Sequence, residues 1–451
     1  MKKTENINTI INLCKTRGFI FAGSDIYDGL ANTWDYGPLG VELKNKIKQL
    51  WWKEFVLENH NSVGIDGGIL MNRNVWVASG HVSGFSDPLM DCRGCKSRLR
   101  ADKLIEEKFP DVSADGWDNQ RLLDYVNQHD IKCPVCGKRD WTDIRQFNLM
   151  FETYRGVTKD NSAQIFLRPE TAQSEYINFI NVQRAMRLKI PFGIGQIGKA
   201  FRNEITPGNF IFRTIEFEQM EHQLFCKDED ALREYQNYKQ KTLAFYTQTL
   251  GISPENLRFR DHEKLVFYAK AACDAEYLFP FGWGEINGTH HRGIHDLSSH
   301  QKLSGKSMEY FDPITNQKFI PTVIESSHGV DRIFLALLCD AYHIDGDRTV
   351  LKLKPSLAPY TVCVLPLQKK DLSETAEKIF RNLQKHFSVS YDESGSIGKR
   401  YFRQDEIGTP FCVTIDYDTL KDGTVTVRER DTTEQTRIKI ADLPKYITDK
   451  Q

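Results

Sequence analysis

Long apolar runs are missing from this sequence of 451 residues. No stretch of about 18 consecutive apolar residues occurs, so we expect no transmembrane helix. Residues 1–15 lack the apolar segment of a secretory signal, and we therefore predict a cytoplasmic protein without a membrane partner. Net charge is also nearly absent, at −1. A nucleic-acid partner would thus have to be held by local basic patches rather than by a field around the whole molecule.

A disulfide framework is not indicated either, although the chain has ten cysteines. Four of them form two Cys-x-x-Cys pairs, Cys92 with Cys95 and Cys133 with Cys136, and each such turn presents two thiolates to one ion. We expect a structural Zn²⁺ site in a reducing compartment, with four ordinary buried cysteines as the alternative. The long stretch between the pairs predicts helices over 102–108 and 119–128, in an inserted subdomain over about 92–145.

The segment 193–225 predicts a hairpin, because two extended runs flank the turn signal Thr206-Pro207-Gly208-Asn209. Small residues leave room on one face and charged residues point into it, as on a sheet surface that binds a phosphate, an amine and a base. An exposed antiparallel face with ordinary ion pairs is the alternative. By alternation, the residues predicted on this face are Gln196, Gly198, Ala200, Arg202, Glu204, Phe217, Gln219 and Glu221.

Further helices and strands are predicted around this hairpin. Apolar residues at helical spacing indicate a helix from Ile7 to the break at Gly18 and a longer one over 39–55, followed by a strand over 65–70. Hairpin strands are expected over 147–166, and amphipathic spacing predicts a helix over 232–250. An apolar strand turns at Gly329 into a helix with Phe334 on its core face.

The C-terminal part reads as a separate domain. After a linker over 352–359, residues 360–451 alternate strand, helix and strand, which favours an open α/β sheet. The segment 396–408 interleaves aromatic and cationic residues, as an RNA-contacting surface does. A solvated basic helix is the alternative for this segment.

Three segments carry a resemblance to a known family. Phe201-Arg202-Asn203-Glu204 with the following 212–217 resembles motif 2 of the class II aminoacyl-tRNA synthetases, the Gly-x-Asp-Arg at 329–332 resembles motif 3, and 35–70 resembles motif 1. The surrounding sequence, Arg168-Pro169-Glu170-Thr171 included, is similar to the homodimeric glycyl-tRNA synthetases. This resemblance implies an α+β fold: an antiparallel class II catalytic domain over 1–351 with a zinc-knuckle insertion, and an α/β anticodon-binding domain over 360–451.

The resemblance also implies a reaction, in which ATP activates glycine and glycine is then joined to the 3′ end of tRNA(Gly). Attack on the α-phosphorus needs charge neutralisation and in-line positioning more than a general base. Arg202, Arg332 and Glu285 are the implied catalytic residues, with Glu285 holding Mg²⁺. The implied ATP-binding residues are Arg202, Asn203, Glu204, Phe212, Arg213, Phe217, Glu285, Ile286, Gly329, Asp331 and Arg332. The implied glycine-binding residues are Arg100, Glu170, Phe217, Glu218, Gln219, Glu221, Glu325, Ser327 and Gly329.

Three other functions are also compatible with the sequence. A class II synthetase for serine, threonine or proline would share motifs 2 and 3 but is expected to lack 168–171 joined to 217–221. A non-catalytic nucleic-acid-binding relative need not keep Arg202, Glu204 and Arg332, and a zinc-dependent nucleic-acid binder is a third candidate. No domain-sized segment is left over for editing, and the smallest amino acid needs none, because a packed wall rejects larger side chains.

Overall fold

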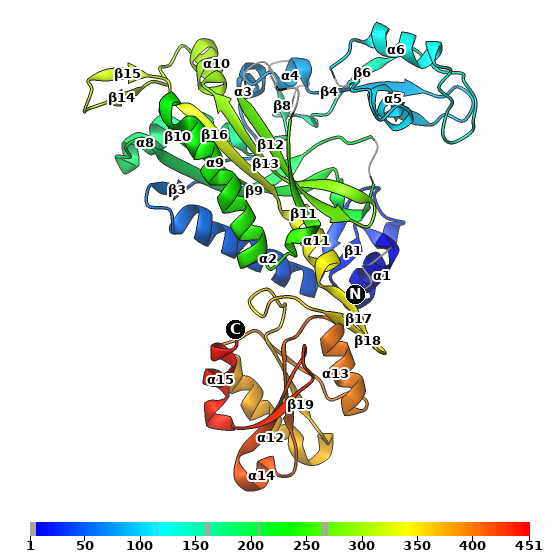
Figure 1. Cartoon of the computed structure of the whole chain (residues 1–451), viewed down its shortest axis with the longest axis vertical. Helices are drawn as coiled ribbons and strands as arrows, with labels where there is room; N and C mark the ends of the chain where they lie inside the picture. Colours follow the sequence, from blue (N-terminus) through cyan, green and yellow to red (C-terminus); the bar gives the residue numbers. More distant parts are fainter. Residues whose placement is uncertain (1–5, 115, 158–162, 206–207, 263–264, 266–268) are drawn as a thin grey trace.

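A seven-stranded sheet lies at the centre of the computed structural model, which describes residues 6–114, 116–157, 163–205, 208–262, 265 and 269–451. Neighbouring strands run antiparallel except β3 and β9, which are parallel, so the predicted α+β fold with mainly antiparallel sheets is confirmed. In spatial order the strands are β11 (Leu257–Asp261), β12 (Ala271–Phe279), β13 (Gly282–Gly293), β16 (Thr322–Gly329), β10 (Glu216–Cys226), β9 (Phe192–Phe201) and β3 (Ser62–Gly64) (Figure 1).

Three helices cover one face of this sheet, which we call the helix face. They are α2 (Pro38–Trp52), α9 (Asp228–Ala244) and α11 (Val330–Ala341), and their apolar side chains form the main core with those of the sheet. Helix α2 begins at Pro38, whose fixed φ suits the first helical turn, and it buries Leu39, Leu43 and Ile47 at four-residue spacing. A π-helical turn, Lys53–Leu57, extends α2 and keeps Phe55 in the core.

The opposite face, which we call the pocket face, is covered at one end. Helices α7 (Ala172–Ile177), α8 (Phe179–Met186) and α10 (His295–Ser304) lie there, and a cluster of apolar residues including Phe179, Phe192 and Phe225 joins them to the strands. Shorter elements complete this part of the fold: α3 (Arg73–Ala78), α4 (His81–Gly84), β7 (Glu152–Tyr154), β8 (Gln164–Phe166), β14 (Tyr310–Asp312) and β15 (Gln317–Phe319).

Two N-terminal parts flank the central sheet. Helix α1 (Ile7–Arg17) ends at the predicted break, Gly18, which takes the left-handed conformation, and is followed by the β1 (Ile20–Ala22) and β2 (Trp34–Tyr36) pair. An insertion projects from one side of the molecule (Figure 1). It consists of β4 (Ser86–Asp91), β5 (Arg98–Arg100), α5 (Ala101–Lys108), α6 (Asn119–Gln128) and β6 (Arg145–Asn148), which confirms the two helices predicted there.

The C-terminal residues form a separate mixed sheet with its own core (Figure 1). Its spatial order is β20 (Val389–Tyr391), β19 (Val362–Pro366), β21 (Phe411–Ile415), β22 (Thr424–Glu429) and β23 (Gln435–Lys439). The helices around it are α12 (Lys369–Leu383), α13 (Ile397–Glu406), α14 (Thr419–Asp422) and α15 (Leu443–Asp449). The hairpin of β17 (Tyr342–Asp345) and β18 (Arg348–Leu351) leads into it from α11.

Two sequence predictions need correction. The strand predicted over 65–70 is wrong, because β3 covers Ser62–Gly64 and the chain leaves the sheet afterwards; at Gly67 a Cβ would lie 2.4 Å from that of Ser174. Arg400, predicted on an RNA-contacting surface, is 4% exposed and donates to the carbonyl oxygen of Pro366.

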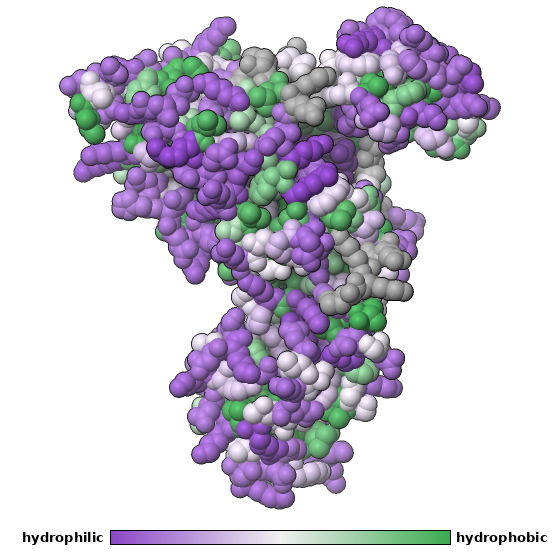
Figure 2. Space-filling model, in the orientation of Figure 1, coloured by the Kyte–Doolittle hydropathy of each residue, from purple (hydrophilic) through white to green (hydrophobic). Residues whose placement is uncertain are grey.

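The outer surface is mostly polar. Figure 2 shows hydrophobic residues scattered in small groups over one face of the molecule. Within the described ranges, we find no helix whose length and hydropathy would suit a membrane span.

Candidate active site

The pairing of β9 with β10 places the residues predicted on the ligand-binding sheet face, which we call the platform, on the pocket face. Glu221 lies opposite Gln196 and Gln219 opposite Gly198, as side-chain alternation predicted. Gly198 has to be small, because a Cβ there would lie 2.2 Å from Nη2 of the buried Arg168. The strand ends before Arg202, so Arg202 and Glu204 lie in the connection between the strands; the turn residues 206–207 lie outside the described residues.

A cavity of about 110 Å³ opens beside this platform. All of the predicted ATP-binding residues except Asn203 border it, and so do several of the predicted glycine-binding residues. From the first group these are Arg202, Glu204, Phe212, Arg213, Phe217, Glu285, Ile286, Gly329, Asp331 and Arg332; from the second they are Phe217, Glu218, Gln219, Ser327 and Gly329. Segments far apart in sequence therefore meet at one cavity.

The guanidinium groups at the cavity are held by neighbours on several elements. Arg202 donates from Nε to the carbonyl oxygen of Pro169 at 3.1 Å, and its guanidinium carbon lies 5.3 Å from the centre of the Phe217 ring. Arg332 donates to the carbonyl oxygen of Phe212 at 3.2 Å and lies 4.4 Å from that ring. Both residues border the cavity, and guanidinium groups suit the recognition of phosphate oxygens.

Glu285 is an ionised carboxylate at the edge of this cavity. Its Oε2 lies 3.2 Å from Nη1 of Arg332. The positive charges of Arg332, His290 and Arg202 hold the pKa of Glu285 below its usual value, and its side chain is 49% exposed. A carboxylate beside cations that suit phosphate is a suitable ligand for a hard divalent ion.

Glu221 is the centre of an adjoining acidic group. Its Oε1 accepts hydrogen bonds from Ser327 at 2.7 Å and from Gln219 at 3.1 Å, and Thr171 donates to its other oxygen. Ser327 and Gln219 also border the cavity, so the acidic group and the cavity are contiguous. Burial, together with the negative charges of Glu325 and Glu170, raises the pKa of Glu221 to about 7.

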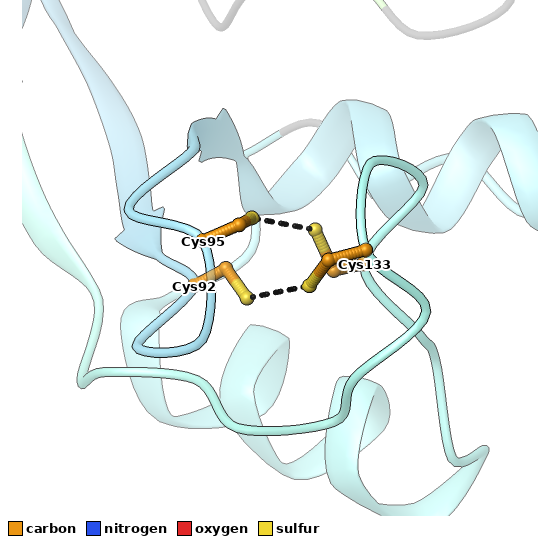
Figure 3. A group of neighbouring side chains, drawn as sticks. Cys92, Cys95 and Cys133 are labelled. Carbon is orange, nitrogen blue, oxygen red and sulfur yellow. Dashed lines mark hydrogen bonds between the residues drawn. The ribbon is translucent and has the colours of Figure 1, made fainter.

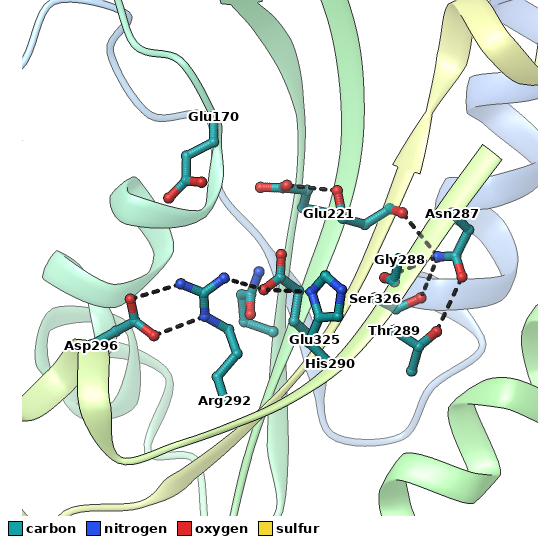
Figure 4. A network of polar contacts seen from close by, with 12 residues as sticks. Glu170, Glu221, Asn287, Gly288, Thr289, His290, Arg292, Asp296, Glu325 and Ser326 are labelled. Atoms are coloured by element: carbon teal, nitrogen blue, oxygen red, sulfur yellow. Dashed lines mark hydrogen bonds and ion pairs between the residues drawn. The ribbon is translucent and has the colours of Figure 1, made fainter. Parts of the chain in front are cut away.

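Basic side chains on neighbouring elements contact the other two predicted acids of this group, and Figure 4 draws Arg292 and His290 beside Glu325. Glu325 lies 2.6 Å from Nη1 of Arg292 and 3.7 Å from His290, which together keep its pKa low despite burial. Glu170 lies 3.5 Å from Nε2 of His81. Burial works against ionisation of Glu170 too, but the charge of His81 lowers its pKa well below the usual range.

Two acids predicted at the site turn away from it. The Glu218 carboxylate lies on the helix face, 3.0 Å from Lys44 and 3.1 Å from Lys48, because Phe217 and Gln219 take the pocket face, although Glu218 also borders the cavity. Asp331 borders the cavity, yet its carboxylate accepts from the buried Lys44 on the helix face at 3.0 Å.

Arg100 and Asn203 are placed outside the cavity. Arg100 forms ion pairs with Asp87 at 2.9 Å and Asp102 at 2.6 Å, and it borders a separate cleft together with Arg213. Asn203 is tied by its backbone N–H to the carbonyl oxygen of Leu149 at 2.8 Å. Neither residue borders the cavity that the other predicted ATP-binding residues line.

Sequence reasoning missed several residues of the acidic group. Arg292, near the end of β13, bridges Glu325 of β16 and Asp296 in the first turn of α10, and because it lies on a strand no helical spacing pointed to this pairing. Thr171 and His81 hold Glu221 and Glu170 respectively. These two contacts join segments distant in sequence, so no local pattern pointed to them.

The two Cys-x-x-Cys pairs come together in the insertion (Figure 3). Sγ of Cys92 lies 3.5 Å from that of Cys136, and Sγ of Cys95 lies 3.6 Å from that of Cys133. All four sulfurs lie within 4.8 Å of one another. Zinc–sulfur bonds of about 2.3 Å in a tetrahedron separate sulfurs by roughly 3.8 Å, so the residues fit a Zn²⁺ ion.

Comparisons with known proteins agree over the full chain. It is 57% identical to the glycine–tRNA ligase of Clostridium acetobutylicum, over 100% of both chains, and 56% identical to that of Clostridium perfringens, over 98% of both. The chain belongs to the glycine–tRNA ligase family. It is therefore an aminoacyl-tRNA ligase, as the sequence predicted. The relative in Caldanaerobacter subterraneus subsp. tengcongensis is 57% identical over 98% of both chains.

Two family models match parts of the chain. The model described as anticodon binding domain matches residues 361–450, the C-terminal sheet and its helices. The model described as glycyl-tRNA synthetase insertion domain 1 matches residues 111–149, which include Cys133 and Cys136. Membership in the glycine–tRNA ligase family therefore agrees with the architecture of both parts.

Proposed function

We propose that this chain forms glycyl-adenylate from glycine and ATP at the described cavity and then joins glycine to the 3′ end of tRNA(Gly). One observation carries the proposal: Ser327 and Gln219 border the cation-lined cavity and also bind Glu221, the centre of the acidic group. A site for a polyanion and a site for an ammonium group are thus contiguous. Adenylation joins two substrates of this kind.

The cavity accounts for the nucleotide half of the reaction. Arg202 neutralises the α-phosphate while the glycine carboxylate attacks, and Arg213 and Arg332 hold the outer phosphates. Phe217 and Arg332 enclose the adenine, and Glu204 accepts a hydrogen bond from its amino group. Glu285 would hold Mg²⁺, which would supply positive charge to offset that of the phosphate groups. These assignments follow the resemblance to the class II synthetases, residue by residue, and the residue types suit each charge.

The acidic group accounts for the amino-acid half. Glu221 and Ser327 bind the ammonium group, and Glu170 and Glu325 add negative charge around it. A buried ammonium needs such partners because an unpaired charge away from water is costly. Close packing around the α-carbon then rejects any larger amino acid by clash.

The remaining parts supply assembly and tRNA recognition in this proposal. Residues 1–351 form a class II catalytic domain, α2 contributes to a homodimer, and residues 360–451 contact the anticodon after the 352–359 connection. The four cysteines of the insertion hold Zn²⁺, which maintains the fold around Arg100. Zinc analysis of purified protein tests the metal assignment, and less than about half an equivalent under non-chelating conditions would contradict it.

The experiment that tests the function is ATP–pyrophosphate exchange with purified protein and Mg²⁺, against each of the twenty amino acids. We expect exchange with glycine alone. Exchange with a different amino acid would support adenylate formation but contradict the assignment of the acidic group to glycine. No exchange, with or without added tRNA, would reject adenylate formation by this chain.

A further inference from the structure

A buried ion network lies on the helix face, directly behind the nucleotide cavity. Lys44 of α2 is only 5% exposed, and its Nζ lies 3.0 Å from Oδ1 of Asp331 and 3.0 Å from Oε2 of Glu218. The ammonium group of Lys44 thus joins three segments: helix α2, strand β10 and the first turn of helix α11. These segments are separated by more than a hundred residues of sequence.

Further contacts make this junction specific. The second oxygen of Asp331 accepts from the backbone N–H of Glu218 at 2.8 Å, and the Tyr36 hydroxyl donates to Asp331. The Tyr36 ring lies 4.0 Å from Nζ of Lys44, within cation–π range. Lys48, one helical turn further along α2, lies 3.1 Å from Glu218. Both carboxylates are therefore held from two directions.

Charge balance supports an ionised network. Burial opposes the charged form of each group, yet the nearby carboxylates raise the pKa of Lys44, and the nearby ammonium group lowers the pKa of Asp331. A buried ion pair of this kind contributes little stability compared with apolar packing, but it specifies one geometry. In this protein the network lies beside residues that border the cavity, so it bears on how those residues are placed.

Each carboxylate of the network lies next to a residue of the nucleotide site. Glu218 stands between Phe217 and Gln219 on β10, and these two point to the pocket face because side chains alternate. Asp331 immediately precedes Arg332, which borders the same cavity. Fixing Glu218 and Asp331 against one ammonium group therefore fixes Phe217 relative to Arg332.

We propose that Lys44 is a positioning residue for ATP, which acts through Glu218 and Asp331 to hold Phe217 and Arg332 in place across the cavity. This inference rests on the proposed function, since it presumes that ATP occupies the cavity. It adds a residue of the first long helix to the nucleotide site, although the Lys44 side chain lies on the opposite face of the sheet.

The test compares pyrophosphate-exchange kinetics of the full chain and its Lys44→Met variant, which keeps the side-chain length and removes the charge. We expect the KM for ATP to rise roughly tenfold and the KM for glycine to change less than about threefold, the scale of coupling between contacting residues. Lys44→Arg is expected to recover most of the ATP affinity. Lys53→Met is the control, because Lys53 is exposed and pairs with Glu58.

Two results would overturn the proposal: equal rises in both KM values, or a lower thermal midpoint with both KM values unchanged. If Lys44→Met fails to fold, Glu218→Gln tests the proposal instead. It removes the charge of Glu218 and leaves Lys44 paired with Asp331. A KM for ATP equal to that of the parent chain in Glu218→Gln would reject the proposal. Calorimetric titration with Mg²⁺-ATP keeps the two proposals distinct. ATP binding that weakens about tenfold in Lys44→Met supports positioning even if the parent chain shows no glycine-dependent exchange, whereas absence of ATP binding by the parent chain rejects both.

Discussion

The two faces of the central sheet bury charged side chains in different balance. On the helix face, Lys44 and Lys48 meet Glu218 and Asp331, so that two ammonium groups match two carboxylates. On the pocket face, four carboxyl groups lie together, those of Asp296, Glu325, Glu170 and Glu221 (Figure 4). The basic groups in contact with them are the guanidinium group of Arg292 and the imidazoles of His290 and His81.

The difference teaches how a structural network is distinguished from a binding site. A balanced set of buried charges is complete without a ligand, and its members can be read as positioning groups. A set with surplus negative charge is completed by a cation, and the raised pKa of Glu221 is the physical sign of that surplus. The ammonium group of glycine is such a cation in the proposed reaction.

The largest expected effect comes from removing the cation of the pocket face. Arg292→Leu leaves Asp296 and Glu325 without their nearest partner, so we expect the free energy of unfolding to fall by about 3–5 kcal/mol. Denaturant unfolding measures this change. Arg233→Leu, at an exposed arginine, is the control. A loss below about 1 kcal/mol for Arg292→Leu would break the contrast between the faces.

The second effect concerns the carboxylate that binds the ammonium group. Glu221→Ala is expected to raise the activation barrier for glycine by about 2–4 kcal/mol, because a buried ammonium loses its partner. The kcat/KM for glycine in pyrophosphate exchange measures it. Glu216→Ala on the same strand is the control, since Glu216 is exposed and pairs with Lys199. An unchanged kcat/KM in Glu221→Ala would refute the glycine assignment.

The pH dependence gives a third, smaller effect on the pocket face. Because the pKa of Glu221 is raised to about 7, its carboxyl group gains a proton as the pH falls through that value. The protonated form does not pair with ammonium, so kcat/KM for glycine should fall roughly tenfold between about pH 8 and pH 6. A flat profile over this range would show that Glu221 is ionised throughout. Glu221→Gln should remove the dependence.

The smallest effect is expected at the edge of the helix face. Lys48 is partly exposed, and its partner Glu218 retains Lys44, so Lys48→Met should lower the free energy of unfolding by at most about 1 kcal/mol. Urea unfolding in low and high salt tests this prediction. A loss of several kcal/mol would mean that the helix-face network is not balanced without Lys48.

Much of the local structure was predictable from the sequence. Alternation placed Glu221 and Gln219 on one face of β10, and the same alternation places the Glu218 side chain on the other face. The start of α2 at Pro38 and the end of α1 at Gly18 follow from the φ angles these residues favour. Each of these results depends on neighbours within a few residues.

The remaining part of the site required the tertiary structure. A buried charge takes its partner from whichever segment packs against it, and Lys44 meets Asp331, Thr171 meets Glu221 and the cysteine pairs meet each other only in the folded chain. The inward turn of Arg400 has the same cause, since the carbonyl oxygens that receive its N–H groups lie on other segments. By itself the sequence determined the periods, the caps and the chemical types of the site residues. Tertiary packing decided which buried charges are neutralised within the protein and which are left for a ligand. The reason is that the energy between two charges depends on their distance in space and not on their separation along the chain.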